Sequence, residues 1–252
     1  MLKVNAKDFK QLLDEFKLSN TMEIIDGVFK FTDDEVIIEQ FAPPQICRSK
    51  LVLKKEFFIE YEKLENIGIG SISEFVALIG KFKKDIIISV EGNLLTISEG
   101  KRIVESELVD EQFITDPTEM NVEYTNSFVM PINILKDIFE TKSIKENKLT
   151  TMTIKTEENK VSYKTKGKYK FSNEFEIEGI TEENTSTFGV PFFEALEKFV
   201  GKGSKTENLL ICIGDNYPLT VIKSGTNYEM TILIAPHNEE EEWIKQMKFL
   251  DL

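Results

Sequence analysis

Hydrophobic residues recur at helical spacing in four short stretches of the chain. In residues 7–18 they occupy positions i, i+3, i+4 and i+7, which is the stripe that an amphipathic helix buries. Residues 71–84 and 191–205 repeat this spacing, and residues 131–145 follow it more loosely. The pattern predicts one short helix in each stretch.

Alternating β-branched and polar residues fill the stretches between these helices. Such alternation, interrupted by short polar turns, is typical of antiparallel hairpins. We expect hairpins in residues 28–40, 86–97, 151–164 and 209–222. Each half of the chain would then contain a helix, a hairpin, a helix and a hairpin, with matching elements about 120 to 125 residues apart.

The repetition predicts an α+β protein built from two similar domains. Residues 110–123 contain Pro117 and few strand formers, which favours a linker between the halves. We therefore expect an N-terminal domain in residues 1–109, a C-terminal domain in residues 124–242 and a tail in residues 243–252. The alternative is an ordinary α+β protein whose halves resemble each other by chance.

The four predicted helices carry a charge opposite to that of the whole chain. The 252 residues include 44 acidic and 31 basic ones, for a net charge of −13, yet the helical stretches hold twelve basic and eight acidic residues. If the helices line one surface, that surface is basic; for each single lysine, simple solvation is the alternative. The lysines on the polar faces are Lys10, Lys17, Lys81, Lys84, Lys136, Lys145, Lys198, Lys202 and Lys205.

Lysine dominates the basic residues, since Arg48 and Arg102 are the two arginines of the sequence. Bidentate reading of guanine by arginine is therefore nearly absent, whereas lysine contacts phosphates as a point charge. A lysine-lined surface would hold nucleic acid weakly, without sequence preference and with strong sensitivity to salt. The acidic remainder would repel DNA, so a ring or groove with a basic interior would guide a duplex through one place.

Several segments resemble a known family, the sliding clamp of archaeal and eukaryotic replication, proliferating cell nuclear antigen (PCNA). The most specific is Leu-Ile-Ala-Pro at residues 233–236, followed by the acidic run 239–242. Residues 53–61, 90–94 and 216–219 support it by their order and spacing. The resemblance covers nearly the whole chain up to residue 242.

The resemblance implies the DNA clamp fold. In it, two similar domains each place paired short helices on antiparallel sheets, and three copies close into a ring around duplex DNA, bound without sequence preference. The cations that would face the DNA are Lys10, Lys17, Lys81, Lys84, Lys136, Lys198 and Lys202. Ring closure would pair the edge strand near residues 101–108 with the one near residues 169–177 of the next subunit. The interface residues would be Arg102, Ile103, Val104, Tyr169, Phe171 and Phe175.

The resemblance also implies partners: a DNA polymerase, a nuclease and a ligase that dock a Gln-containing, aromatic-ended peptide, and a clamp loader. The pocket for the peptide would be lined by Phe41, Ile46, Phe113, Ile114, Pro218, Leu233, Ala235 and Pro236. Arg48 and Asp116 depart from the family, because apolar residues are common at both positions. The pocket is then altered or prefers other partners, and the ring is a homotrimer or a heterotrimer with homologous subunits.

Catalytic chemistry finds little support in the sequence. His237 is the one histidine, and Cys47 and Cys212 belong to no metal motif, so no metal and no cofactor are expected. The Asp33-Asp34 pair reads as solvated charge in a turn. We expect a protein that is not an enzyme. Two alternatives to the ring are a monomeric or dimeric processivity factor and an acidic adaptor without a DNA role.

Targeting signals and membrane spans are not expected. The longest stretch without a charge, residues 124–135, is shorter than the roughly 20 residues needed to cross a bilayer. We expect an intracellular protein, in the cytoplasm or nucleoid if archaeal and in the nucleus if eukaryotic. The tail, residues 243–252, would pack on its own subunit; alternatively, Gln246 with Phe249 and Leu250 imitates a clamp-binding peptide.

Overall fold

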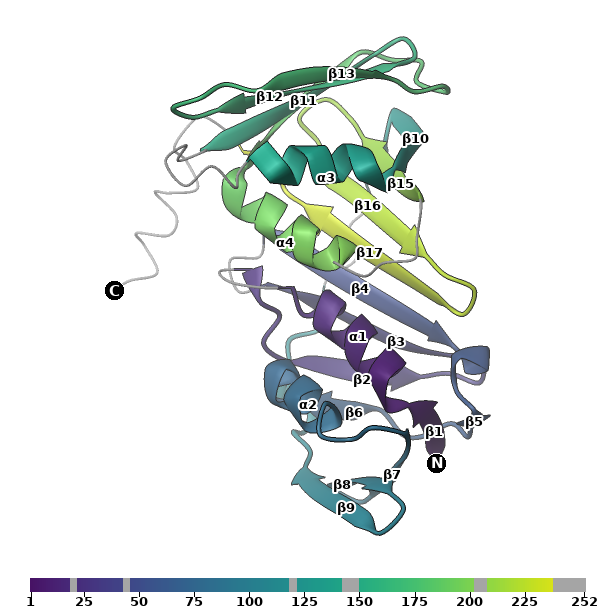
Figure 1. The fold of residues 1–252 in the computed structure, drawn as a ribbon. Coiled ribbons are helices and arrows are strands. Elements are labelled where there is room, and N and C mark those ends of the chain that lie inside the picture. Colours follow the sequence, from purple (N-terminus) through teal and green to yellow (C-terminus); the bar gives the residue numbers. More distant parts are fainter. Residues whose placement is uncertain (19–21, 43–45, 118–121, 142–149, 202–207, 238–252) are drawn as a thin grey trace, which may run out of the picture.

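The computed structural model describes residues 1–18, 22–42, 46–117, 122–141, 150–201 and 208–237. Its helices lie in a row on one side of the sheets (Figure 1). Helix α1 contacts both α2 and α4, and α3 contacts α4, so the order along the row is α3, α4, α1, α2. The helices are α1 (Ala6–Phe16), α2 (Ile72–Ile79), α3 (Ile132–Thr141) and α4 (Val190–Val200).

Local sequence explains where the helices begin. The side chain of Asn5 accepts hydrogen bonds from the backbone N–H groups of Lys7 and Asp8 and so caps α1. Ser71 Oγ accepts from the N–H of Glu74 and caps α2. The sequence predicts a helix up to residue 84, because the hydrophobic spacing continues past Gly80. In the structure, α2 ends earlier, at Ile79. Lysines 81 and 84 therefore follow the helix instead of lying on it.

The first half of the chain supplies strands β1 to β9. They are β1 (Leu2–Asn5), β2 (Gly27–Phe31), β3 (Glu35–Phe41), β4 (Cys47–Lys54), β5 (Glu60–Tyr61), β6 (Ile67–Ile69), β7 (Asp85–Glu91), β8 (Leu94–Glu99) and β9 (Arg102–Glu107). Single turns of 3₁₀-helix cover Lys55–Phe57 and Glu111–Phe113.

The second half supplies strands β10 to β17. They are β10 (Asn126–Pro131), β11 (Thr151–Glu157), β12 (Lys160–Lys166), β13 (Ser172–Glu176), β14 (Asn184–Gly189), β15 (Asn208–Ile213), β16 (Leu219–Ser224) and β17 (Tyr228–Ile234). The predicted hairpins are present as β2–β3, β7–β8, β11–β12 and β15–β16.

The strands form three sheets, and the two halves repeat the same arrangement. In the first half, β1-β7-β8-β9 forms one run of neighbours and β6-β2-β3-β4 another. In the second half the corresponding runs are β10-β15-β16-β17 and β14-β11-β12-β13. This repeat confirms the prediction of an α+β protein with two similar halves.

One junction joins the halves into a continuous sheet. Strand β17 pairs antiparallel with β4 over seven residue pairs, from Tyr228 opposite Leu53 to Ile234 opposite Cys47. The result is an eight-stranded sheet of order β10-β15-β16-β17-β4-β3-β2-β6. The matching strands β9 and β13 end their own sheets, at opposite ends of the molecule (Figure 1).

The hydrophobic core lies between the helix row and the sheets. The stripe predicted for α1 is buried there, and Phe9 meets Phe75 of α2 edge-on, with ring centroids 6.3 Å apart. Phe75 also packs edge-on against Phe29 of β2 at 5.6 Å. Full burial of such a side chain stabilises the fold by about 1.5 to 3 kcal/mol, so these contacts fix the helix row on the sheet.

Candidate functional site

Lys10, Lys81 and Lys84 gather around the end of α2. A Cβ added to Gly80 would lie 2.9 Å from Cε of Lys10, so the stem of this lysine crosses the chain just before Lys81. Lys81 and Lys84 are exposed and Lys10 is half-buried. None of the three forms an ion pair with an acidic residue of the described chain. They therefore present positive charge at this end of the helix row.

Lys136 carries the corresponding charge on α3, at the other end of the row. Its side chain is exposed, and it forms no ion pair with any residue that the structure describes. Lys145, Lys202 and Lys205, also expected on helix faces, lie outside the described residues.

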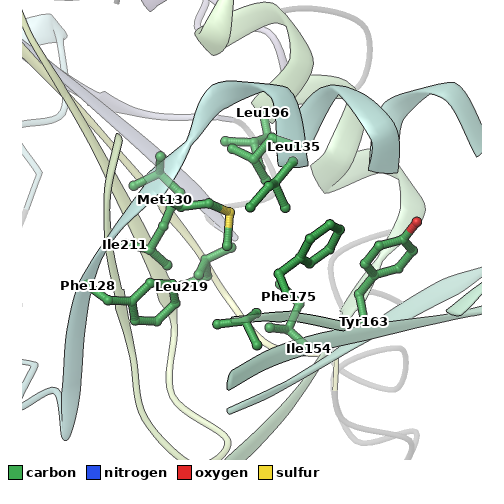
Figure 2. A pocket seen from close by; sticks show the side chains of 12 residues that line it. Phe128, Met130, Leu135, Ile154, Tyr163, Phe175, Leu196, Ile211 and Leu219 are labelled. Carbon is green, nitrogen blue, oxygen red and sulfur yellow. The ribbon is translucent and has the colours of Figure 1, made fainter. Parts of the chain in front are cut away.

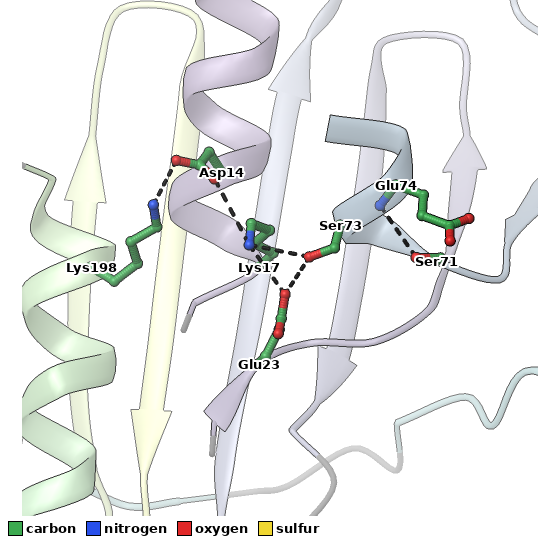
Figure 3. A network of polar contacts seen from close by, with 7 residues as sticks. All are labelled: Asp14, Lys17, Glu23, Ser71, Ser73, Glu74 and Lys198. Carbon is green, nitrogen blue, oxygen red and sulfur yellow. Dashed lines mark hydrogen bonds and ion pairs between the residues drawn. The ribbon is translucent and has the colours of Figure 1, made fainter. Parts of the chain in front are cut away.

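Lys17 and Lys198 differ from the other lysines because carboxylates already hold them (Figure 3). Nζ of Lys17 lies 3.1 Å from Oε1 of Glu23 and 3.9 Å from Oδ1 of Asp14, and its side chain is 17% exposed. Nζ of Lys198 lies 2.5 Å from Oδ2 of Asp14. The hydrophobic spacing predicted both lysines on the polar faces of helices, but it did not predict their acidic partners.

Glu23 is held in its charged form. Ser73 donates a hydrogen bond to its carboxylate, and this bond, more than the nearby Lys17, lowers the pKa of Glu23 below its ordinary value of 4.5. Glu23 comes from the segment before β2, and Ser73 comes from α2. Glu23, six residues further along the chain, and Ser73 of α2 thus fix the ammonium group of Lys17 together.

A buried ion pair joins the two halves beneath this surface, and sequence reasoning missed it. Nζ of Lys223 on β16 lies 2.6 Å from Oε2 of Glu15 on α1 and donates to the carbonyl of Val200 at the end of α4. The side chains are 1% and 6% exposed. The signal was present in the sequence: Lys223 continues the inward alternation of Leu219 and Val221.

Gly201 leaves the space for this pair. Its φ is +74°, and an added Cβ would lie 2.3 Å from Oε1 of Glu15. A side chain here would be strained and would collide with the carboxylate. Glycine is therefore required where α4 passes the ion pair.

The strands expected at the subunit interface are both sheet edges. Among the described residues β9 pairs with β8 alone and β13 pairs with β12 alone. Ile103 is 60% exposed and Tyr169, in the loop before β13, is 45% exposed. Val104, Phe171 and Phe175 are half-buried. Each strand therefore leaves one row of backbone N–H and C=O groups open for pairing.

Arg102 is exposed but also engaged within the chain. Its Nη1 donates to the carbonyl of Lys81 at 2.7 Å, and its guanidinium lies 5.2 Å from the ring centroid of Phe82. These contacts tie the start of β9 to the segment after α2. They connect the expected interface strand to the lysines at the end of the helix row.

Part of the expected peptide pocket lies on the face of the eight-stranded sheet away from the helices, which we call the outer face. Phe41, Arg48 and Leu233 are direct neighbours across β3, β4 and β17, and the N–H of Ala235 donates to the carbonyl of Ile46. Phe113 is 77% exposed, whereas Ile114 is buried. Phe41, Ile46, Pro218, Leu233, Ala235 and Pro236 are half-buried.

Arg48 places a cation in the middle of this group. Its Nη2 lies 2.8 Å from Oε1 of Glu39, and its guanidinium lies 5.5 Å from the ring centroid of Phe41. Arg48, paired with Glu39, therefore stands between Phe41 and Leu233, where the family resemblance suggests an apolar side chain.

The segment after β9 is attached to the first half by several contacts. The N–H of Val109 donates to the carbonyl of Gly68, and an added Cβ on Gly68 would lie 2.2 Å from the carbonyl oxygen of Val109. Gln40 donates to the carbonyl of Thr115, and Nζ of Lys30 lies 2.6 Å from the carboxylate of Asp116. The unusual acidic residue at position 116 thus has a basic partner on β2.

A small void lies in the core of the second half (Figure 2). Its volume is about 20 Å³ and its walls are apolar, so it offers a water molecule no polar partner. Its lining comprises Phe128, Met130, Ile134, Leu135, Ile154, Val161, Tyr163, Phe175, Leu196, Ile211, Leu219 and Val221. This void is a packing defect and not a ligand site.

The described residues contain no group of three or more His, Cys, Asp or Glu side chains placed to hold a metal ion. Asp33 and Asp34, the carboxylates considered for catalysis, lie in ion pairs with Lys63 and Lys55. Across the described chain, no helix has both the length and the apolar character of a membrane span. The acidic run 239–242 and the tail 243–252 lie outside the described residues.

Curated proteins of similar sequence are sliding clamps, although no protein-family model matches the chain. The DNA polymerase sliding clamp 1 of Thermococcus kodakarensis is 28% identical, with 93% of this chain and 96% of the relative covered. The DNA polymerase sliding clamp of Methanothermobacter thermautotrophicus is 27% identical, with 76% and 80% covered.

Solved structures of similar fold are also clamps. PCNA of A. fulgidus, bound to the C-terminal region of FEN-1, superposes with a TM-score of 0.78 at 18% identity, covering 95% of this chain and 99% of that one. PCNA of Entamoeba histolytica gives a TM-score of 0.77 at 17% identity, with 94% and 98% covered. These neighbours share the fold, and the curated relatives share the sequence. Together with the repeated halves and the single row of helices, they show that the chain resembles the PCNA family of sliding clamps in sequence and in fold.

Proposed function

We propose that this chain is a subunit of a sliding clamp that encircles duplex DNA and tethers replication and repair enzymes to it. It performs no reaction of its own. Encirclement turns dissociation into sliding, so a bound polymerase or nuclease stays at high effective concentration on its substrate. The domain bounds proposed with this function are 1–109 and 124–242, connected by residues 110–123.

The observation that carries the proposal is the repeated sheet junction. Within the chain, β17 of the second half pairs with β4 of the first. In the repeated arrangement, β9 corresponds to β17 and β13 corresponds to β4, and both β9 and β13 lie at the edge of a sheet. If β9 of one copy pairs with β13 of the next, the same junction recurs between copies. A chain of such junctions that closes on itself is a ring, and closure leaves neither β9 nor β13 as an open edge.

Charge supports an antiparallel pairing of these edges. Strand β9 begins with Arg102 and ends with Glu105 and Glu107, while Lys168 and Lys170 precede β13, which ends at Glu176. Antiparallel pairing would place the acidic end of β9 beside the lysines before β13. Parallel pairing would place like charges together, which costs stability. The proposed interface residues Arg102, Ile103, Val104, Tyr169, Phe171 and Phe175 lie on or beside these two strands.

The proposed DNA contacts are the lysines at both ends of the helix row. Lys10, Lys81, Lys84 and Lys136 make no ion pair with the described residues, so they can contact phosphates. Sequence-independent contact of this kind weakens steeply with salt. The partner peptides would bind at the outer face, beside the Glu39–Arg48 pair, and would include those of a polymerase, a nuclease and a ligase. A clamp loader would open the ring.

The proposed setting is the interior of the cell, in association with chromosomal DNA. For a protein from an archaeon this means the cytoplasm and nucleoid, and for one from a eukaryote the nucleus. The ring consists of copies of this chain or of this chain with homologous subunits.

Two measurements test the proposal. The mass in solution should be about three times 29.0 kDa when the chain forms the ring alone. A stable monomer at micromolar concentration would argue against self-assembly, and the experiment would then be repeated with co-expressed homologous subunits.

Retention on DNA tests encirclement itself. Rings loaded on closed circular DNA should persist, and linearising the circle should release them through the free ends. Blocking the ends should restore retention. A protein that leaves circular and linear DNA at the same rate does not encircle the duplex.

A further inference from the structure

Asp14 lies between two lysines in the middle of the helix row (Figure 3). One of its carboxylate oxygens is 2.5 Å from Nζ of Lys198 on α4, and the other is 3.9 Å from Nζ of Lys17, the residue that follows α1. Glu23 holds Lys17 from a second side at 3.1 Å. The middle of the row thus contains two lysines matched by two carboxylates.

This matching changes what DNA would meet. A phosphate approaching Lys198 also approaches the carboxylate of Asp14, so attraction and repulsion largely cancel beyond a few ångströms. The same holds for Lys17 beside Glu23. The lysines near the end of α2 and on α3 have no such partners among the described residues. The row therefore has basic ends and a neutral middle.

We propose that Asp14 limits the grip of the clamp on DNA by keeping Lys17 and Lys198 from the phosphates. The proposal rests on the proposed function, because it assumes that the helix row faces DNA. In it, Asp14 is a positioning residue that acts through the two lysines. Its consequence is a loosely held duplex and easier sliding.

Asp14→Asn keeps the shape of the side chain and removes its charge. Lys198 then loses its ion-pair partner and becomes available to a phosphate, while Lys17 keeps Glu23. Each additional phosphate contact steepens the dependence of log K on log salt by about 0.9. The variant should therefore bind a short labelled duplex more tightly at low salt and with a steeper salt slope than the unmodified chain.

Glu74→Gln is the matched control. It changes the net charge by the same amount on the neighbouring helix α2, yet the exposed Glu74 carboxylate forms no ion pair with a described lysine. A general charge effect would give the same slope in both variants. In the double variant Asp14→Asn with Lys198→Met, the extra contact is gone, and the slope should return to that of the unmodified chain.

The experiment measures binding to the duplex by fluorescence anisotropy across a salt series. A steeper slope for Asp14→Asn than for Glu74→Gln, reversed by Lys198→Met, supports the proposal. Equal slopes for Asp14→Asn and Glu74→Gln overturn it. If the unmodified chain is not retained on circular DNA, the proposed function itself fails, and that outcome is distinct from equal slopes in a chain that is retained.

Loss of the Asp14–Lys198 contact also removes a link between the halves. The melting temperature and the mass of each variant are therefore measured first. If Asp14→Asn does not fold, Lys198→Met alone serves instead. Because Asp14 already keeps Lys198 from the phosphates, this variant should keep the salt slope of the unmodified chain, and a shallower slope overturns the proposal.

Discussion

At the scale of single residues, two ion pairs connect the two halves of this protein. Glu15 and Asp14 are adjacent on α1, and each holds a lysine from the second half, Lys223 or Lys198. The first pair is buried and the second is partly exposed. Burial makes the first pair costly to break, since the remaining charge could not be solvated.

Replacing Lys223 by Met should lower the free energy of unfolding by about 3 to 5 kcal/mol, because Glu15 would be left buried without its partner. Denaturant unfolding measures the loss. The double variant with Glu15→Leu should recover much of it, since neither charge is then buried. Lys198→Met, at the partly exposed pair, should cost less than about 1 kcal/mol. A double variant no more stable than Lys223→Met would contradict this account.

Cys47 should be almost unreactive in the folded protein. Burial raises the pKa of its thiol to about 12, so very little thiolate exists at pH 8. In a Cys212→Ser variant, a thiol reagent should modify Cys47 only as fast as the chain unfolds. The stability that the neutral thiol contributes is complete below the unfolded pKa near 9 and is lost as the pH rises towards 12. Rapid modification at neutral pH would show an accessible thiol.

At the scale of elements, the sequence predicted those whose pattern is local. The apolar stripe of α1 and the hairpin β7–β8 follow from spacing alone. Strands β1 and β10 were not predicted from pattern because they lead directly into helices and are not joined by a short turn to the next strand. The pairing of β4 with β17 joins residues more than 170 positions apart, and no local pattern encodes such a partnership. The lysines of the helix row were predicted from spacing, whereas the pairing of Lys198 with Asp14, 184 positions away, was not, for the same reason. Glu23 lies near Lys17 in the sequence but in an irregular segment, where spacing does not place its side chain.

The edge strands should respond to charge reversal in a complementary way. Glu105→Lys with Glu107→Lys reverses the end of β9, and Lys168→Glu with Lys170→Glu reverses the segment before β13. Each reversal alone should weaken assembly at least about tenfold, because like charges then meet. Combining both in one chain should restore the trimer. Sedimentation across a concentration series measures this.

A result that would contradict the pairing is assembly unaffected by either reversal. A dimer instead of a trimer would show that β9 pairs with β9 of a second copy, which the charges of that strand also allow. Circular dichroism of each variant confirms that the chain itself stays folded.

At the scale of the whole molecule, the row of helices collects several lysines that have no acidic partner among the described residues. In an acidic protein, the unpaired lysines Lys10, Lys81, Lys84 and Lys136 lie along one row of helices, and the sheets lie behind that row. The helices stand on one side because each half buries their apolar stripes against its sheets, and the β4–β17 junction sets the halves next to each other.

Reversing Lys10, Lys81 and Lys136 to Glu should abolish retention on circular DNA while leaving the trimer intact, because the change places acids where phosphates would lie. Retention is measured with rings loaded on labelled circles. The matched control reverses Lys50, Lys54 and Lys164, which lie on strands β4 and β12 and, like the first three, form no ion pair with a described residue, and it should keep retention. Equal loss in both variants would show that net charge, and not the helix row, governs binding.

The junction inside each chain has a mechanical consequence. Strands β4 and β17 are held together by backbone pairing, by the Glu15–Lys223 and Asp14–Lys198 contacts beside them, and by the covalent chain that connects the halves. An interface between two copies of the chain, formed by β9 and β13, would have no covalent connection across it. When force is applied to a closed ring, the interfaces between subunits should therefore separate first, while each subunit stays folded as one rigid unit.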